Sequence, residues 1–127
     1  MSEAMYQDSP PSVLVVSDHV VAGKALATYL ERHGFRVVGC VGSAVSAAEA
    51  TTRLHPDVAL VDGEIGGGWR GVVAALDGAP ERPRIAVLSS YWAHGERVEA
   101  ARSGVGATML KRIPGADLAL QLRGLVA

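Results

Sequence analysis

Short apolar runs alternate with longer amphipathic stretches five times along the chain. The apolar runs cover residues 13–16, 35–41, 58–62, 85–89 and 107–110. Their unbroken hydrophobicity is typical of parallel strands that are buried on both faces. The segments between the runs carry apolar residues at helical spacing and predict helices over residues 20–33, 43–54, 69–76, 95–103 and 115–126.

Strict alternation of strand and helix predicts an α/β fold with helices on both faces of a parallel sheet, because right-handed crossovers allow few other arrangements. We expect the flavodoxin-like (βα)5 topology, a doubly wound five-stranded sheet with strand order 2-1-3-4-5. In that order the first and third strands flank the switch point where ligands bind. Asp18 follows the first strand and Asp62 ends the third. The topology therefore predicts that these two acids face one crevice.

Composition describes a single domain with an aliphatic core. The chain has 127 residues, of which 49% are hydrophobic and 5% aromatic. Its formal net charge is -1, from 12 basic and 13 acidic residues. A charge this close to zero predicts no direct contact with nucleic acid or with an anionic membrane surface. Cys40 lies in an apolar run and is interpreted as a buried thiol of a reducing compartment.

The first residues are expected to lie outside the fold. Residues 1–11 are polar and end in two prolines, which indicates a flexible lead-in to a domain over residues 12–127. This segment does not resemble a signal peptide, and no apolar stretch approaches the ~20 residues that a membrane span needs. We therefore expect the protein in the cytoplasm.

Four segments place polar or charged side chains at the ends of predicted strands. They are VVSDH at residues 15–19, PDVALVD at 56–62, VLSS at 87–90 and MLK at 109–111. Any one of them alone is a weak signal. Together and in this order, the four segments make residues 12–127 resemble the receiver domain of bacterial two-component response regulators.

The resemblance implies a role for each of these side chains. Asp62 is expected to be the phosphoacceptor, which attacks a phosphohistidine of a sensor histidine kinase and becomes an aspartyl phosphate. Mg²⁺ is expected to bind the carboxylates of Asp18 and Asp62 and the backbone carbonyl of Glu64. Lys111 would pair with Asp62 before modification and with a phosphoryl oxygen afterwards. Ser89 would donate its hydroxyl. Any enzymatic activity would be limited to self-phosphorylation and self-dephosphorylation.

The resemblance also implies what the phosphoryl group changes. In receivers the surface formed by the fourth helix, the fifth strand and the fifth helix reorganises on phosphorylation. Here these elements are predicted over residues 95–103, 107–110 and 115–126. Expected partners are the sensor kinase, an output domain or downstream protein that controls transcription, and a second copy of the chain. The chain ends with the last predicted helix, so it is either a stand-alone regulator or part of a longer one.

The acidic pocket departs from the family pattern at Ser17. Receivers usually carry two consecutive acids where this chain has Ser17 and Asp18. A missing charge about 4 to 6 Å from a divalent ion costs on the order of 1 to 3 kcal/mol after solvation and screening. We therefore expect weak Mg²⁺ binding and an impaired phosphoacceptor. Ser17 is expected to contribute by orienting a metal-bound water.

Other departures concern the loops around the site. Residues 63–67 are rich in glycine and lack the usual proline, which predicts a mobile loop. Arg112 replaces the proline that usually follows the lysine, so no cis peptide bond is assumed there. Thr108 replaces the usual aromatic switch residue. The nearest aromatic residues, Tyr91 and Trp92, are candidates for an interaction surface.

Alternatives remain open on these residues. The chain is either a phosphorylated receiver or an atypical one that binds a protein or a small ligand without phosphorylation, with Asp18 and Asp62 as structural acids. An unrelated flavodoxin-like cofactor binder is a third possibility, although residues 66–68 lack the context of a phosphate-binding loop.

His19 adjoins the acidic site and is expected to modify its properties rather than to bind the metal, because Mg²⁺ prefers oxygen ligands. The other three histidines are assigned to the surface.

Overall fold

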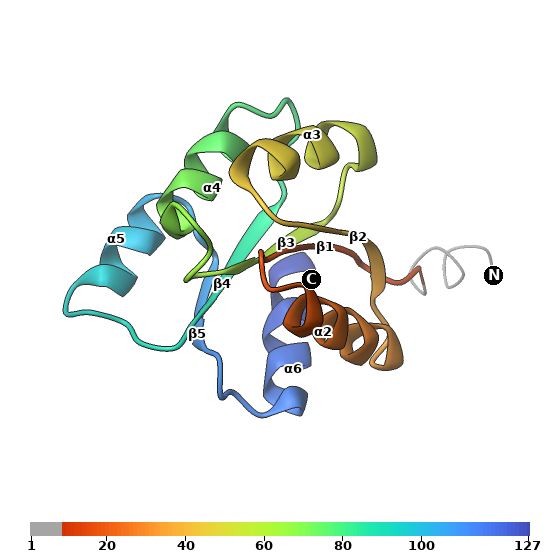
Figure 1. Ribbon diagram of the computed structural model, residues 1–127. Coiled ribbons are helices and arrows are strands. Elements are labelled where there is room, and N and C mark those ends of the chain that lie inside the picture. The colour runs from red at the N-terminus through yellow and green to blue at the C-terminus, as the bar shows by residue number, and fades with distance from the viewer. Residues whose placement is uncertain (1–8) are drawn as a thin grey trace.

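The computed structural model describes residues 9–127, and in this part of the chain five parallel strands form one sheet with helices on both faces (Figure 1). The strand order is β2-β1-β3-β4-β5, as the sequence predicted. The elements are β1 (Ser12–Val16), α2 (Val20–Arg32), β2 (Arg36–Val41), α3 (Ala44–Leu54), β3 (Val58–Asp62), α4 (Gly68–Asp77), β4 (Arg84–Ser89), α5 (Glu96–Arg102), β5 (Ala107–Leu110) and α6 (Gly115–Val126).

Alternate residues of the central strands feed two separate cores. Val13 and Val15 of β1 face helices α2 and α6, whereas Leu14 and Val16 face α3, α4 and α5. Figure 1 shows these two groups of helices on opposite sides of the sheet. All four of these residues are at most 1% exposed. Burial on both faces explains why this strand reads as an unbroken apolar run.

Helix ends follow the predicted local signals. The Ser43 side chain accepts a hydrogen bond from the Ser46 amide at 3.1 Å and caps α3. Gly34 has φ +89° and turns the chain after α2, a conformation that costs glycine little. His55 ends α3 in the left-handed region with φ 48°. Gly34 and His55 therefore end their helices where the next strands can begin.

One interpretation of the sequence is wrong on the edge strand β2. Cys40 is exposed rather than buried, because β2 is an edge strand that is only partly covered. Its thiol pKa is still raised, by partial desolvation and by the nearby Glu31 charge. Of the predicted lead-in, residues 9–11 are described: β1 follows them at Ser12, and the Pro11 carbonyl accepts a hydrogen bond from the Arg36 amide at 2.9 Å. Residues 1–8 of that lead-in lie outside the described residues.

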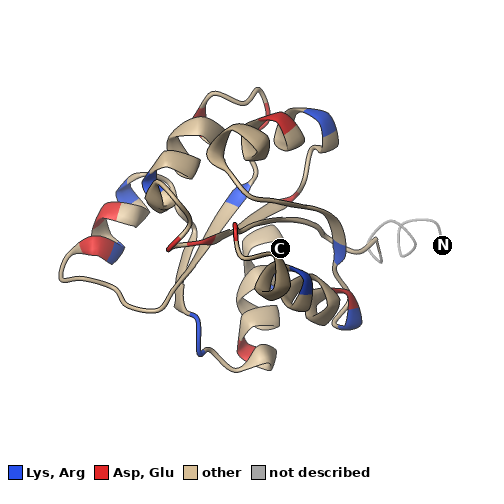
Figure 2. Ribbon diagram, in the orientation of Figure 1, with Lys and Arg blue, Asp and Glu red and all other residues tan. Residues whose placement is uncertain are grey.

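Other features can be stated for the described chain alone. Every peptide bond among these residues is trans, including Lys111–Arg112. Over the same residues, no helix has both the length and the apolar character needed to span a bilayer. Lysines and arginines lie dispersed over several helices and strand ends (Figure 2).

Candidate functional site

Four strands deliver polar side chains to one edge of the sheet. β1 runs into Ser17 and Asp18, β3 ends at Asp62, β4 ends at Ser89, and β5 runs into Lys111. Because parallel strands share a direction, these residues converge without help from the helices. The structure thus brings together the residues that the sequence singled out.

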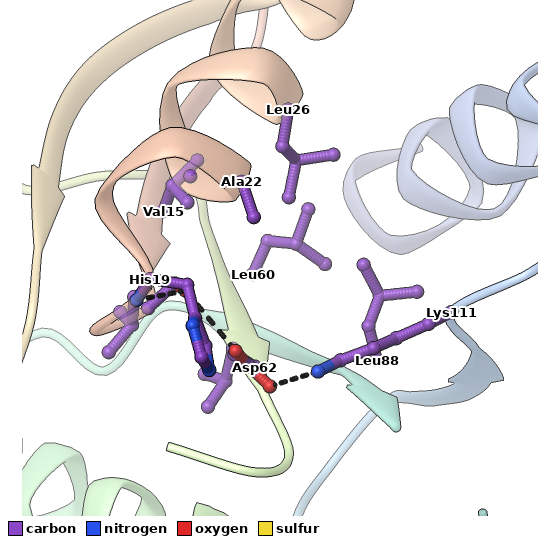
Figure 3. A pocket seen from close by; sticks show the side chains of 12 residues that line it. Val15, His19, Ala22, Leu26, Leu60, Asp62, Leu88 and Lys111 are labelled. Carbon is purple, nitrogen blue, oxygen red and sulfur yellow. Dashed lines mark hydrogen bonds and ion pairs between the residues drawn. The ribbon is translucent and has the colours of Figure 1, made fainter. Parts of the chain in front are cut away.

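Asp62 lies at the centre of this group. Its carboxylate Oδ1 is 2.7 Å from Lys111 Nζ and accepts a hydrogen bond from the Glu64 amide at 2.9 Å. Its Oδ2 accepts a hydrogen bond from the Ser17 hydroxyl at 3.2 Å. The Asp62 side chain is only 9% exposed. Figure 3 shows it between Lys111 on one side and the β1–α2 loop on the other.

A cavity of about 240 Å³ lies beside the Asp62 carboxylate. Apolar side chains from β1, α2, β3 and β4 form most of its wall, among them Ala22, Leu26, Leu60 and Leu88 (Figure 3). The cavity therefore presents mainly apolar side chains next to the Asp62 carboxylate.

The Glu64 carboxylate is a part of the site that the sequence pattern did not predict. It was expected to contribute only its backbone carbonyl, but its side chain lies within the group. Ser89 Oγ donates to Oε2 at 2.6 Å, Ser90 Oγ donates to Oε1 at 2.9 Å, and the Ser90 amide is 3.1 Å from Oε1. Lys111 Nζ is 2.7 Å from Oε1. The one feature of the sequence that could have indicated this role is the position of Glu64, an acid two residues after the aspartate that ends a strand.

These contacts shift the ionisation of both partners. Partial burial acts to raise the pKa of Glu64, but hydrogen bonds from Lys111, Ser89 and Ser90 outweigh it and lower this pKa to about 2. Burial likewise acts to lower the pKa of Lys111, but Asp62 and Glu64 outweigh it and raise this pKa above its ordinary value. Glu64 is therefore an anion and Lys111 a cation throughout the physiological range.

Asp18 and His19 complete the group on the β1 side. One ligand atom each of Asp18, His19 and Asp62 lie within 4.8 Å of one another. Asp18 Oδ2 accepts a hydrogen bond from the Gly66 amide at 3.0 Å, which fixes its direction. The His19 ring is 4.0 Å from Asp18 Oδ1. Three carboxylates here face one ammonium, so the site carries excess negative charge.

This donor set fits a divalent cation. Two carboxylates from neighbouring strand ends supply the oxygen ligands that Mg²⁺ prefers. The excess negative charge favours a cation over an anion in the resting site. The Ser17 hydroxyl, for which the sequence predicts that it orients a metal-bound water, donates a hydrogen bond to Asp62 at 3.2 Å. The His19 nitrogen, which was not expected to be a ligand, lies close enough to join the two carboxylates.

The two candidate aromatic residues lie in different environments. Tyr91 is 74% exposed, whereas Trp92 is half-buried and donates from Nε1 to the Met109 carbonyl at 3.0 Å. Trp92 also packs near Trp69 of α4, with ring centroids 6.3 Å apart. Trp92 therefore ties the β4–α5 loop to β5 beside Thr108, while Tyr91 remains on the surface.

Known proteins support the family assignment. The family model described as the response regulator receiver domain matches residues 13–123. A search of curated protein sequences found no match.

Solved structures share the fold over nearly the whole chain. A DNA-binding response regulator of the LuxR family from Staphylococcus aureus is 18% identical, with a TM-score of 0.82 over 92% of this chain and 99% of that one. The signal receiver domain of a protein described as the response regulator NarL from Mycobacterium tuberculosis is 22% identical, with a TM-score of 0.84 over 93% and 97%. A response regulator from Thermotoga maritima is 22% identical, with a TM-score of 0.77 over 92% and 98%.

The match to the family model covers most of the chain, and the solved receiver structures share its fold. The chain belongs to the response regulator receiver family, the receiver domains of two-component signal transduction.

Proposed function

We propose that Asp62 accepts a phosphoryl group from the phosphohistidine of a sensor histidine kinase. An Asp62 carboxylate oxygen attacks phosphorus, a P–O bond forms, and the P–N bond to the imidazole breaks with its electron pair leaving on nitrogen. The observation that carries this proposal is the position of Asp62, a shielded carboxylate held by Lys111 at 2.7 Å with Asp18 alongside. Any enzymatic activity of the chain is confined to its own phosphorylation and dephosphorylation.

The neighbouring side chains would position and neutralise the phosphoryl group. Lys111 has a flexible stem, so its ammonium can follow the new negative charge as it moves from the carboxylate to a phosphoryl oxygen. Ser89, a residue that is only 4% exposed, supplies a hydroxyl donor from the neighbouring strand. Phosphoryl transfer needs little else from the protein than such positioning and charge stabilisation.

A divalent cation would complete the neutralisation. Asp18 and Asp62 would hold Mg²⁺ through their carboxylates and Glu64 through its backbone carbonyl, and the ion would neutralise charge on the phosphoryl oxygens. Ser17 in place of a second acid makes this binding weak. The excess negative charge of the resting site makes a cation necessary before an anionic group can enter.

The output surface in this proposal is formed by α5, β5 and α6. Ser89 at the end of β4 is followed by the loop through Trp92, which is hydrogen-bonded to β5. A movement of Ser89 can therefore be transmitted through this short loop to β5 and the output surface. We infer that its rearrangement acts on an output domain or a downstream protein that controls transcription, or on a second copy of the chain, in the cytoplasm.

A second function is favoured by two observations. Ser17 replaces a metal-binding acid, and the Glu64 carboxylate already engages Lys111 and Ser89. Both would suit an atypical receiver that binds a protein or a small ligand without phosphorylation. In that case Asp62 is a structural acid.

Fluoroberyllate, a phosphoryl mimic, separates the two functions. The protein is mixed with fluoroberyllate and excess Mg²⁺, and amide spectra are recorded for the wild type and for Asp62→Asn. A phosphoacceptor shifts the amides of residues 62, 89 and 111 in the wild type alone. Unchanged wild-type spectra would sink the phosphoacceptor proposal and favour the atypical receiver.

A further inference from the structure

We propose that the Glu64 side chain is a built-in competitor of the phosphoryl group, because its carboxylate occupies the hydrogen-bond donors that a phosphoryl group on Asp62 needs. The inference rests on the proposed function of Asp62 and adds a regulatory element to it. To bind the phosphoryl oxygens, the site must first release its own carboxylate.

The donors around Glu64 form an anion-binding cradle. Ser89 Oγ lies 2.6 Å from Oε2, while Ser90 Oγ at 2.9 Å and Lys111 Nζ at 2.7 Å contact Oε1. The Ser90 amide lies 3.1 Å from Oε1 and 3.2 Å from Oε2. Two hydroxyls, an amide and an ammonium are the donors that also bind phosphoryl oxygens. Glu64 therefore uses both of its oxygens on groups suited to a tetrahedral anion.

Lys111 makes the two anions exclusive. Its ammonium is 2.7 Å from both Asp62 and Glu64 and holds the two carboxylates side by side. A phosphoryl group on Asp62 would add negative charge beside Glu64, with one ammonium between them. Like charges at such distances repel each other. Binding of the phosphoryl group and retention of Glu64 are therefore in competition.

Ser89 gives the competition a second point of contact. A hydroxyl has one proton, and Ser89 Oγ lies within reach of two acceptors, Glu64 at 2.6 Å and the Tyr91 carbonyl at 2.8 Å. The charged carboxylate is the stronger acceptor. While Glu64 accepts this hydrogen bond, the Ser89 proton cannot be donated to a phosphoryl oxygen on Asp62.

The backbone of the β3–α4 loop favours this arrangement. A Cβ on residue 63 would lie 3.0 Å from the Leu88 carbonyl oxygen and 3.0 Å from the Ser89 Cβ. Glycine at this position lets the loop pack against the end of β4, and the Gly63 amide donates to the Leu88 carbonyl at 2.7 Å. Because the backbone at residue 63 is held against β4, the Glu64 carboxylate stays close to these donors. It therefore has a high effective concentration there.

Glu64 can leave the cradle without disturbing the core. Its side chain is 39% exposed, so rotation about its side-chain bonds carries the carboxylate into water. The backbone amide of Glu64 stays on Asp62 at 2.9 Å through a separate hydrogen bond. Displacing the Glu64 carboxylate therefore breaks its hydrogen bonds to the cradle, whereas the backbone of the β3–α4 loop keeps its position.

The test measures the affinity for fluoroberyllate at saturating Mg²⁺ in four proteins: the wild type, Glu64→Ala, Glu64→Asp and, as a control, Glu31→Ala. All four keep the backbone carbonyl at residue 64. Glu31 is an exposed acid on α2 outside the site. Glu64→Asp keeps the negative charge but shortens the side chain, so it separates occupation of the cradle from electrostatics alone. Thermal unfolding confirms that each variant folds.

We expect Glu64→Ala to bind the analogue about tenfold more tightly than the wild type, because several charge-assisted hydrogen bonds no longer need to be broken. Glu64→Asp should also bind more tightly, and Glu31→Ala should match the wild type. Equal affinity of the wild type and Glu64→Ala would overturn the competitor role and leave the phosphoacceptor proposal intact. No binding by any of the four proteins would overturn both.

Discussion

Ser17 is the single residue that most changes the chemistry of this receiver. Its hydroxyl donates to Asp62 at 3.2 Å and accepts from the His19 amide at 3.2 Å. These two bonds use both the proton and a lone pair of the Ser17 hydroxyl. A carboxylate here would instead add charge beside Asp18 and Asp62, where the donor set fits a divalent ion. The serine therefore leaves the site with less negative charge for a cation than an aspartate would.

Replacing Ser17 by aspartate should restore tight cation binding. We expect Ser17→Asp to improve the free energy of Mg²⁺ binding by about 1 to 3 kcal/mol, since it supplies the missing charge. Calorimetric titration measures the change. Thr28→Asp adds the same charge on α2, away from the strand ends that form the site, and should leave the affinity unchanged. An unaltered affinity in Ser17→Asp would show that residue 17 lies outside the cation site.

For single residues, the sequence predicted where the site residues lie in the fold better than it predicted which side chains they contact. Asp18, Asp62, Ser89 and Lys111 converge because each is tied to the end of a parallel strand, and strand ends follow from hydrophobic pattern. Glu64 lies in a loop, where the direction of a side chain depends on backbone angles that pattern does not encode. The close packing of Gly63 against β4 decided that direction.

Among the elements, α4 and α5 are joined by a cluster of polar and aromatic side chains. Trp69 Nε1 donates to Glu96 Oε2 at 2.8 Å, and the Arg70 guanidinium pairs with Glu99 and lies 4.7 Å from the centroid of the Trp69 ring. The Ala93 amide also donates to Glu96, at 2.9 Å. The cluster anchors α5, one part of the proposed output surface, to a neighbour that is itself packed on the core.

Acid should weaken this connection through Glu96. Hydrogen bonds from Trp69 and Ala93 hold the pKa of Glu96 below its ordinary value. Because the pKa is lower in the folded state, the stabilisation is present above the unfolded pKa and is lost as pH falls through the folded one. We expect Glu96→Gln to lower the free energy of unfolding at about pH 7 and to matter less at about pH 3.

Urea unfolding at the two pH values measures this loss. Glu31→Gln removes a charge from an exposed site on α2 and serves as the control. A Glu96→Gln penalty of equal size at both pH values would contradict the role assigned to the charged form.

A pair of glycines tests the packing of the β3–α4 loop. Gly63→Ala places a Cβ against the Leu88 carbonyl and should lower the free energy of unfolding by about 1 to 3 kcal/mol. A Cβ on Gly71 of α4 would meet no neighbouring atom within 4 Å, so Gly71→Ala should raise it by roughly 0.5 to 1 kcal/mol through helix propensity. Denaturant titration of both variants checks the signs. Equal effects would show that the loop is free to yield.

Element boundaries were predictable because the physics behind them is local. Strands β3 and β5 and helix α6 have the predicted bounds, and the Ser43 cap begins α3 as expected. Cys40 was misjudged because an apolar run does not reveal which strand lies at an edge. The orientation of Trp92 depended on a partner in β5, far along the chain, and no local signal carries such a contact.

For the whole molecule, the proposed function gives the two halves of the site opposite effects on a phosphoryl group. Asp62, with its low exposure and its contact with Lys111, would suit an acyl phosphate. Ser17 would weaken cation binding, and the Glu64 carboxylate would occupy the hydrogen-bond donors. In this account the receiver is phosphorylated less readily than one with a full acidic pocket, and the competition at Glu64 sets how readily.

Intact mass after incubation with acetyl phosphate and Mg²⁺ tests the central claim most directly. The account predicts the mass gain of one phosphoryl group in the wild type, none in Asp62→Asn, and a larger modified fraction in Glu64→Ala. Peptide mapping should place the group on Asp62. No gain in the wild type and in Glu64→Ala, with both proteins folded and Mg²⁺ in excess, would contradict the assignment of Asp62 as the phosphoacceptor.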